Sequence, residues 1–223
     1  DIPGSTGLGS SSAFAVGLVH ALHALKGEMV TKHTIAMEAA RIEVDVLGRV
    51  MGKQDHFASA YGDLNVFTFT SDEVVKVDPV LYKYEAKKQI ESNLMLFYLS
   101  IKRNASEILK SQEKETLNKF KELKAIQSLV DPIREIFSSG TDFNSFGSCL
   151  HAGWKIKKKL TNDISSNIID TYYEKAINAG ALGGKLLGAG GGGFLLFYVE
   201  KEKQQKVAKS LSNLYRLPIE FDN

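Results

Sequence analysis

In the N-terminal third of the chain, apolar residues recur at helical spacing in two stretches, which predicts two helices. The first helix follows a stretch rich in glycine and serine, and spacings of three and four residues predict a buried face formed by Phe14, Leu18, Val19 and Leu22. The second covers residues 31–47, with an expected buried face formed by Ile35, Ala36, Ala39, Ile42, Val46 and Leu47.

The pattern then changes from helix to strand and back again. Residues 64–70 and 73–77 alternate around Ser71 and Asp72, which predicts a β-hairpin. Dense apolar runs predict buried strands at 93–100 and 194–199, and a last strand is expected at 219–221. Helical periodicity covers residues 105–136, 146–160, 164–178 and 200–214. The order indicates an α+β fold, divided near Pro79 into domains of residues 1–80 and 81–223.

Composition narrows the class of protein. Of 223 residues, 43% are hydrophobic and 24% are charged, which is typical of a globular chain. The net charge of +2 is small, whereas nucleic-acid-binding proteins usually carry a strong excess of basic residues. No apolar run is long enough to cross a membrane. The single cysteine, Cys149, excludes an internal disulfide and fits a reducing compartment, so we expect a cytoplasmic protein. The sequence leaves a homodimer open.

The first glycine-rich loop predicts an anion site. It runs from Pro3 to Ser12 and opens the first helix, where unpaired backbone N–H groups and the helix dipole attract negative charge. The pattern of P-loop nucleotide-binding proteins is absent, since no lysine follows the second glycine. The dinucleotide-binding pattern fails as well, because Ser12 stands where its third glycine would be. The alternative is a helix capped by glycine and serine without a ligand.

A second glycine-rich segment, residues 180–193, ends in four consecutive glycines. Ordering them costs backbone entropy, so a close approach of the backbone to a ligand or to another loop is the usual reason to keep them. The alternative, a flexible linker, does not fit the apolar flanks.

Two acidic residues flank the loop at residues 48–54. Glu43 lies late in the second predicted helix, and Asp55 follows the loop. Phosphoryl transfer needs a carboxylate on Mg²⁺ and a group that orients the attacking hydroxyl. The alternative is that both acids are solvated, as we expect for Asp45.

These motifs together resemble the GHMP kinases, the family of galactokinase, homoserine kinase, mevalonate kinase and phosphomevalonate kinase. The resemblance spans nearly the whole chain and implies a two-domain fold whose C-terminal domain is ferredoxin-like. It implies that ATP binds to Pro3, Gly7, Leu8, Gly9, Ser10, Ser11, Ser12, Gly188, Gly190 and Gly191. It also implies that Ser11 and Glu43 ligate Mg²⁺ and that Asp55 is the catalytic residue. His56 stands where galactokinases have glutamine, and no catalytic role is assigned to it.

Within this family the chain is most similar to the D-glycero-D-manno-heptose 7-phosphate kinases. That similarity implies transfer of a phosphoryl group from ATP to a sugar phosphate, with Asp55, Arg103 and Lys157 facing the substrate. Lys155, Lys158 and Lys159 are expected to form a solvated face. The alternatives are a kinase of the fucokinase or galactokinase type, a non-catalytic ligand sensor and a plain nucleotide-binding module.

The resemblance further implies that the family's N-terminal segment precedes this chain. Strands of that segment would pair with the hairpin, and an unpaired sheet edge promotes aggregation. We therefore expect the 223-residue chain alone to be poorly soluble or inactive.

Overall fold

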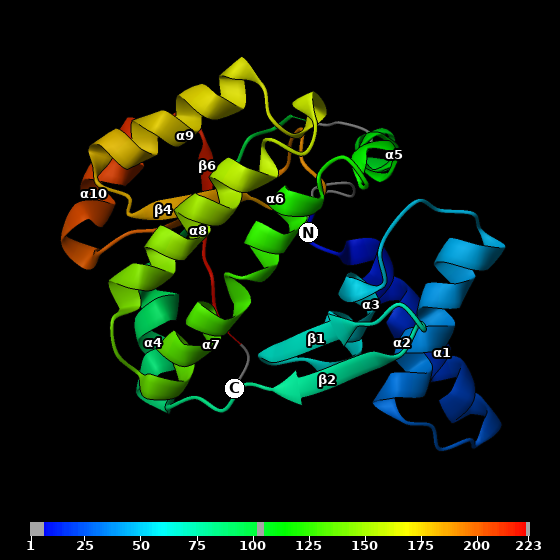
Figure 1. Ribbon diagram of the computed structural model, residues 1–223. Coiled ribbons are helices and arrows are strands. Elements are labelled where there is room, and N and C mark those ends of the chain that lie inside the picture. The colour runs from blue at the N-terminus through cyan, green and yellow to red at the C-terminus, as the bar shows by residue number, and fades with distance from the viewer. Residues whose placement is uncertain (1–6, 102–104, 222–223) are drawn as a thin grey trace. The chain divides into compact units, whose positions relative to one another are not determined.

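The computed structural model describes residues 7–101 and 105–221 (Figure 1). Two of the predicted site residues, Pro3 and Arg103, lie outside the described residues. The described residues form two compact units. Residues 8–80 form the N-terminal unit, and Gly7 together with residues 81–101 and 105–221 forms the C-terminal unit. Both contain helices and strands, so the α+β prediction is confirmed.

The N-terminal unit packs three helices and a hairpin around two small clusters. Its elements are α1 (Ser10–Lys26), α2 (Lys32–Arg41), α3 (Gln54–Tyr61), β1 (Asn65–Phe69) and β2 (Val75–Pro79). The strands pair antiparallel with Asn65 opposite Pro79, which confirms the predicted hairpin. One cluster joins α1 to α2 through Val16 and Ile35, and the other surrounds the fully buried Phe57 of α3.

The buried face of α1 differs from the prediction. Val19 is buried, but Phe14, Leu18 and Leu22 are 72%, 48% and 49% exposed. Helix α1 is apolar around most of its circumference, so its periodicity fits two neighbouring stripes equally well. The stripe containing Val16 and Val19 is the one that packs against α2.

The second predicted helix also ends earlier than expected. Helix α2 stops at Arg41 and continues as one wide π-helical turn, Ile42–Val46, in which the N–H of Leu47 donates to the carbonyl of Ile42 at 2.9 Å. The prediction that Ile42, Val46 and Leu47 are buried is wrong, since all three are exposed. The buried position belongs to Glu43, which follows Ala36 and Ala40 along the same helix face.

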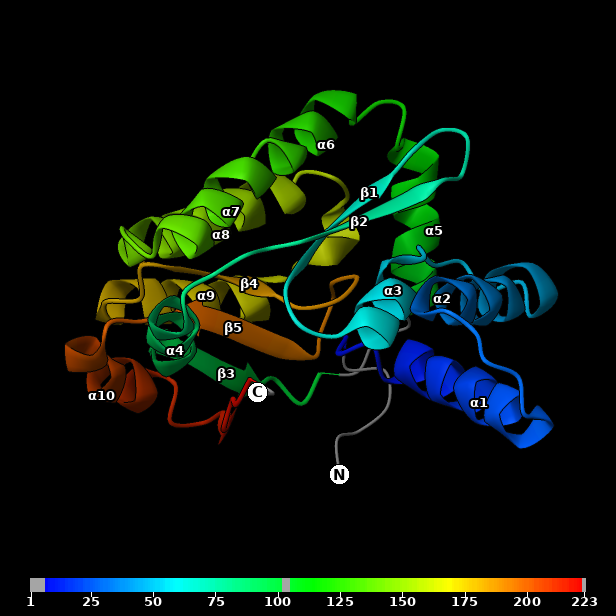
Figure 2. The same ribbon diagram turned by 90° about the horizontal axis from the view of Figure 1, so that it is seen from below.

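The C-terminal unit is built on a four-stranded antiparallel sheet with the order β4-β5-β3-β6 (Figure 2). The strands are β3 (Leu94–Tyr98), β4 (Gly183–Leu186), β5 (Phe194–Tyr198) and β6 (Tyr215–Leu217). The helices are α4 (Tyr84–Asn93), α5 (Ala105–Glu115), α6 (Phe120–Gln127), α7 (Val130–Ser139), α8 (Phe143–Lys157), α9 (Asn167–Ala179) and α10 (Lys201–Ser210).

Helices connect β3 to β4 and β5 to β6, and β4 and β5 are adjacent in sequence and in the sheet. This is the ferredoxin-like arrangement, as predicted. The core contains Phe97 and Phe197 of the sheet, Trp154 of α8, Ile169 of α9 and Val207 of α10. Within the described residues, no helix has the length and apolar character that crossing a membrane requires.

Two strands differ from the prediction. Strand β4 lies inside the segment predicted to be a glycine loop, and the last strand is Tyr215–Leu217 instead of residues 219–221. Tyr215 pairs with Tyr98 and Leu217 with Leu96. Pro218 then follows, and because proline has no N–H it cannot extend the ladder.

Glycines allow α8 to lie almost on the backbone of β4. A Cβ atom at Gly183 would stand 1.8 Å from the carbonyl oxygen of Gly147, and one at Gly147 would stand 2.8 Å from Cβ of Leu182. No side chain fits between these backbones. The two glycines therefore determine how closely α8 packs on the sheet.

We predict that Gly183→Ala destabilises the protein by at least about 1–3 kcal/mol, because the added methyl group overpacks the α8–β4 contact. Chemical denaturation followed by circular dichroism would measure the loss. The matched control is Gly17→Ala in α1, where an added Cβ meets nothing within 4 Å. There alanine is expected to stabilise the helix by about 0.5–1 kcal/mol. Equal stabilities for the two variants would contradict the proposed role of Gly183.

Candidate active site

The start of α1 offers unpaired backbone donors to an anion. Gly9 precedes the helix with a left-handed φ of 69°, and no side chain caps the terminus. The first helical hydrogen bond runs from the N–H of Ala13 to the carbonyl of Gly9 at 2.9 Å. The N–H groups of Ser10, Ser11 and Ser12 therefore precede the first helical bond, and the positive end of the helix dipole adds to their attraction for an anion.

The serine side chains divide between solvent and core. Ser10 and Ser11 are exposed, whereas Ser12 is 1% exposed and its hydroxyl has no hydrogen-bond partner among the described residues. The two exposed hydroxyls can meet a ligand that arrives from solvent. Ser12 can contribute only its backbone N–H.

A buried carboxylate lies next to this helix start. Glu43 is 3% exposed, and Oγ of Ser11 donates a hydrogen bond to its Oε1, which Nη1 of Arg49 also contacts. Nε2 of His56 lies 2.8 Å from the other oxygen, Oε2. Burial alone would raise the pKa of Glu43, but the hydrogen bonds from Ser11 and His56 and the charge of Arg49 lower it below its ordinary value. Glu43 is therefore a carboxylate at neutral pH.

His56 and Arg49 are site residues that sequence reasoning missed. His56 is fully buried beside Phe57 in α3, and its Nδ1 has no partner among the described residues. A polar residue within the apolar face of a short helix was the available signal for His56. For Arg49 no signal exists, because it follows the helix in a loop and is brought to Glu43 only by the fold.

Asp55 occupies the first turn of α3, one residue before His56. Its Cγ lies 3.5 Å from the point where a Cβ atom of Gly9 would stand, so the carboxyl group is next to the glycine loop. Its carboxylate has no hydrogen-bond or ion-pair partner within residues 7–101 and 105–221. The structure thus places Asp55 at Gly9 and Glu43 at Ser11, while Asp45 is exposed, as expected.

The residues around Glu43 fit a magnesium ion. The Ser11 hydroxyl and the Glu43 carboxylate converge on one place, and the Arg49 guanidinium contacts both oxygens there, so the spot attracts positive charge. The described part of the chain has no group of three or more His, Cys, Asp or Glu residues that could hold a metal alone. Such a site suits Mg²⁺, which commonly uses one or two protein oxygens together with phosphates and water.

The second glycine loop is tied to the backbone around it. The N–H of Gly191 donates to the carbonyl of Ile164 at 2.8 Å, and a Cβ atom at Gly190 would stand 2.8 Å from Cα of Ile164. Gly188 lies against Gly7, since a Cβ atom there would stand 2.5 Å from Cα of Gly7. This loop therefore contacts Gly7, and the Gly191 N–H is already used within the protein.

One lysine of α8 also reaches this loop. Nζ of Lys157 donates a hydrogen bond to the carbonyl of Gly188. Lys158 pairs with Asp170 at 2.9 Å, and Lys155 and Lys159 are exposed. Lys157 is thus the only one of these four lysines in contact with the glycine loop.

Comparisons with known proteins agree with these motifs. Residues 1–63 match the family described as the GHMP kinases N terminal domain, and residues 129–217 match the GHMP kinases C terminal domain. Together the two matches cover more than half of the chain.

Among curated proteins, the chain is 30% identical to the D-glycero-alpha-D-manno-heptose 7-phosphate kinase of Campylobacter jejuni, over 95% of this chain and 62% of that protein. It is 25% identical to the galactokinase of Pyrococcus furiosus, over 96% of this chain and 67% of that protein.

Among solved structures, a D-glycero-D-manno-heptose 1-phosphate kinase from Bacteriodes thetaiotaomicron is 26% identical, with a TM-score of 0.77 over 99% of this chain and 62% of that one. This chain therefore spans somewhat less than two thirds of the length of these two heptose phosphate kinases. The two domain matches, in the order of the family and with both glycine loops in place, show that the chain belongs to the GHMP kinase family.

Proposed function

We propose that this protein is a kinase that transfers the γ-phosphoryl group of ATP to a hydroxyl group of a sugar phosphate. The observation that carries the proposal is the position of two carboxylates at one helix start, with Glu43 bonded to Ser11 and Asp55 beside Gly9. Phosphoryl transfer depends on this combination of an anion-binding helix start, a cation site and an acid that faces the nucleophile.

Each residue then has a defined task. The triphosphate of ATP lies along the first glycine loop, where the N–H groups of Ser10, Ser11 and Ser12 bind its oxygens, together with Gly7, Leu8 and Gly9. Gly188, which contacts Gly7, and its neighbours Gly190 and Gly191 form the second glycine segment that we assign to ATP binding. Ser11 and Glu43 would hold Mg²⁺, which would neutralise charge on the phosphates.

Asp55 orients the acceptor hydroxyl. The hydroxyl oxygen forms a bond to the γ-phosphorus, the bond from that phosphorus to the β–γ bridging oxygen breaks, and ADP leaves with the bonding electrons. The hydroxyl proton passes to the Asp55 carboxylate, which is free of other partners in the described part of the chain. Positioning and charge neutralisation supply most of the rate.

The acceptor we propose is D-glycero-D-manno-heptose 7-phosphate, with the 1,7-bisphosphate as product. The identity of 30% to a protein of that name supports this choice, and the solved relative named above is also a heptose phosphate kinase. The test is coupled ADP release by the purified protein with Mg²⁺, ATP and a panel of heptose 7-phosphate, fucose, galactose and mevalonate. Turnover of fucose or galactose instead of heptose 7-phosphate would support the assignment as a kinase but would show that the acceptor is a different sugar.

We predict that Asp55→Asn lowers kcat by about 10²–10⁴-fold, because the amide cannot accept the hydroxyl proton. ATP binding, measured by calorimetry, is expected to stay within twofold of the unchanged protein. Asp45→Asn is the matched control, an exposed acid of the same unit, and should keep full activity. If Asp55→Asn also kept full activity, Asp55 would not be the catalytic residue.

We further predict that Glu43→Gln raises the Mg²⁺ concentration needed for half-maximal activity by at least about tenfold, since one anionic ligand is lost. The variant should also lose the extra thermal stability that Mg²⁺ adds to the complex with a non-hydrolysable ATP analogue. Glu38→Gln in α2, where the acid pairs with His23, is the control and should leave both readouts unchanged. An unchanged magnesium dependence in Glu43→Gln would remove Glu43 from the metal site.

A further inference from the structure

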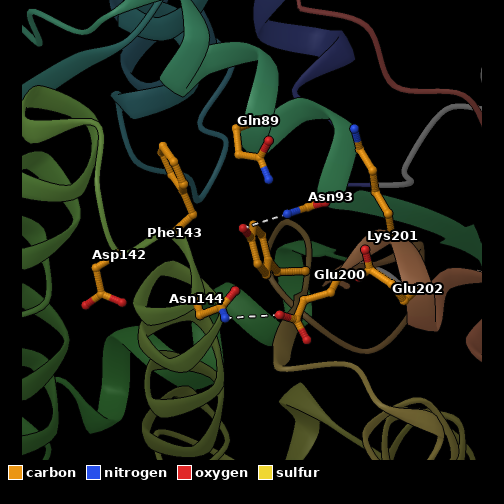
Figure 3. A pocket seen from close by; sticks show the side chains of 9 residues that line it. Gln89, Asn93, Asp142, Phe143, Asn144, Glu200, Lys201 and Glu202 are labelled. Carbon is orange, nitrogen blue, oxygen red and sulfur yellow. Dashed lines mark hydrogen bonds between the residues drawn. The ribbon is translucent and has the colours of Figure 1, made fainter.

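Two cavities of the C-terminal unit carry opposite charge. The larger, of about 340 Å³, is lined by Asp142, Glu200 and Glu202 with one lysine, Lys201 (Figure 3). Its polar groups are largely paired with one another: Asn144 donates to Glu200 at 3.1 Å and Asn93 to Tyr198 at 2.8 Å. Three carboxylates around this cavity disfavour an anion.

The smaller cavity, of about 210 Å³, has the opposite character. It is enclosed by α6, α7, α8 and β4, and Lys157 and Lys185 both line it without a single carboxylate. The remaining walls are apolar, with Leu129 and Ile133 among them. Two cations thus share a space of low polarity with no counter-charge.

The two lysines lack the partners that half-buried ammonium groups normally have. Lys185 makes no hydrogen bond or ion pair with any of the described residues, and Lys157 has only the Gly188 carbonyl. Burial and the neighbouring charge of Lys185 lower the pKa of Lys157 to about 8, and burial lowers that of Lys185. Keeping both charged in this space is unfavourable unless an anion joins them.

Two ammonium groups that line one cavity without a carboxylate are the complement of a small anion with several oxygens.

Contacts within the C-terminal unit link the cavity to Gly7, the described residue of the first glycine loop that belongs to this unit. Lys157 holds Gly188, and Gly188 lies against Gly7 of the first glycine loop. The cavity is smaller than the roughly 300–1,000 Å³ of pockets for whole drug-sized ligands. It suits one phosphate group and is too small for a nucleotide.

We propose that this cavity binds the phosphate monoester group of the acceptor sugar, through the ammonium groups of Lys157 and Lys185. The inference rests on the proposed function for the identity of the acceptor. It adds Lys185 to the substrate site and predicts that a phosphorylated sugar binds more tightly than a free one. The apolar walls strengthen these ionic contacts because they exclude water.

The first test measures phosphate binding directly, without any turnover. Inorganic phosphate is titrated into the purified protein by calorimetry, and its effect on Tm is recorded. Lys185→Met should weaken binding by at least about tenfold, which corresponds to the loss of one hydrogen bond to a charged group. Lys185→Arg should bind nearly as well as the unchanged protein.

Two controls separate loss of the site from loss of the fold. Lys159→Met removes an exposed lysine of the same segment and should bind phosphate normally. In the absence of phosphate, Lys185→Met should melt at the same or a higher temperature than the unchanged protein, because an unpaired half-buried charge is gone. Unchanged phosphate affinity in a folded Lys185→Met protein would overturn the proposal.

The second test identifies the source of the phosphate. Lys185→Met should raise KM for heptose 7-phosphate by at least about tenfold, again the loss of one charged hydrogen bond, while KM for ATP stays unchanged. A rise in KM for ATP alone would assign the cavity to the nucleotide and overturn the acceptor assignment. If no sugar phosphate is turned over at all, the proposed function fails, but the calorimetric titration still decides whether the cavity binds phosphate.

Discussion

The buried carboxylate of Glu43 is the interaction on which the N-terminal unit depends. An unpaired charge at 3% exposure would cost several kcal/mol, so its partners must be held in place. Those partners come from separate segments: Ser11 begins α1, His56 belongs to α3, and Arg49 lies in the loop between α2 and α3. Satisfying one carboxylate therefore fixes the start of α1 relative to α3.

The same network of bonds to Glu43 also positions the residues of the proposed active site. Because His56 turns inward to Glu43, its neighbour Asp55 projects from another side of α3 and lies beside Gly9. The same bond network orients the Ser11 hydroxyl at the helix start. Stability and the proposed catalytic geometry therefore depend on the same contacts in this unit, and replacing any of these partners is expected to affect both.

In the C-terminal unit, the packing depends instead on backbones that approach each other closely at glycines. Glycines let α8 lie on β4 and let the second glycine loop lie on Ile164 and Gly7. The close packing of α8 carries Lys157 to the loop and leaves it in one cavity with Lys185. Two neighbouring cations in a space of low polarity are unfavourable, and this is the reason why we propose that they bind an anion.

The sequence alone determined the α+β class and the hairpin, and it marked both glycine-rich segments and the acids Glu43 and Asp55 as candidates for the site, because each depends on local pattern or on a family motif. Only the tertiary structure decided which apolar stripe of α1 is buried, that Glu43 replaces Ile42 in the core, and that β4 lies inside a glycine-rich segment. It alone brought Arg49 and His56 to Glu43, and Lys185 to Lys157. These are contacts between residues distant in the chain, and local periodicity carries no information about which distant surfaces will meet.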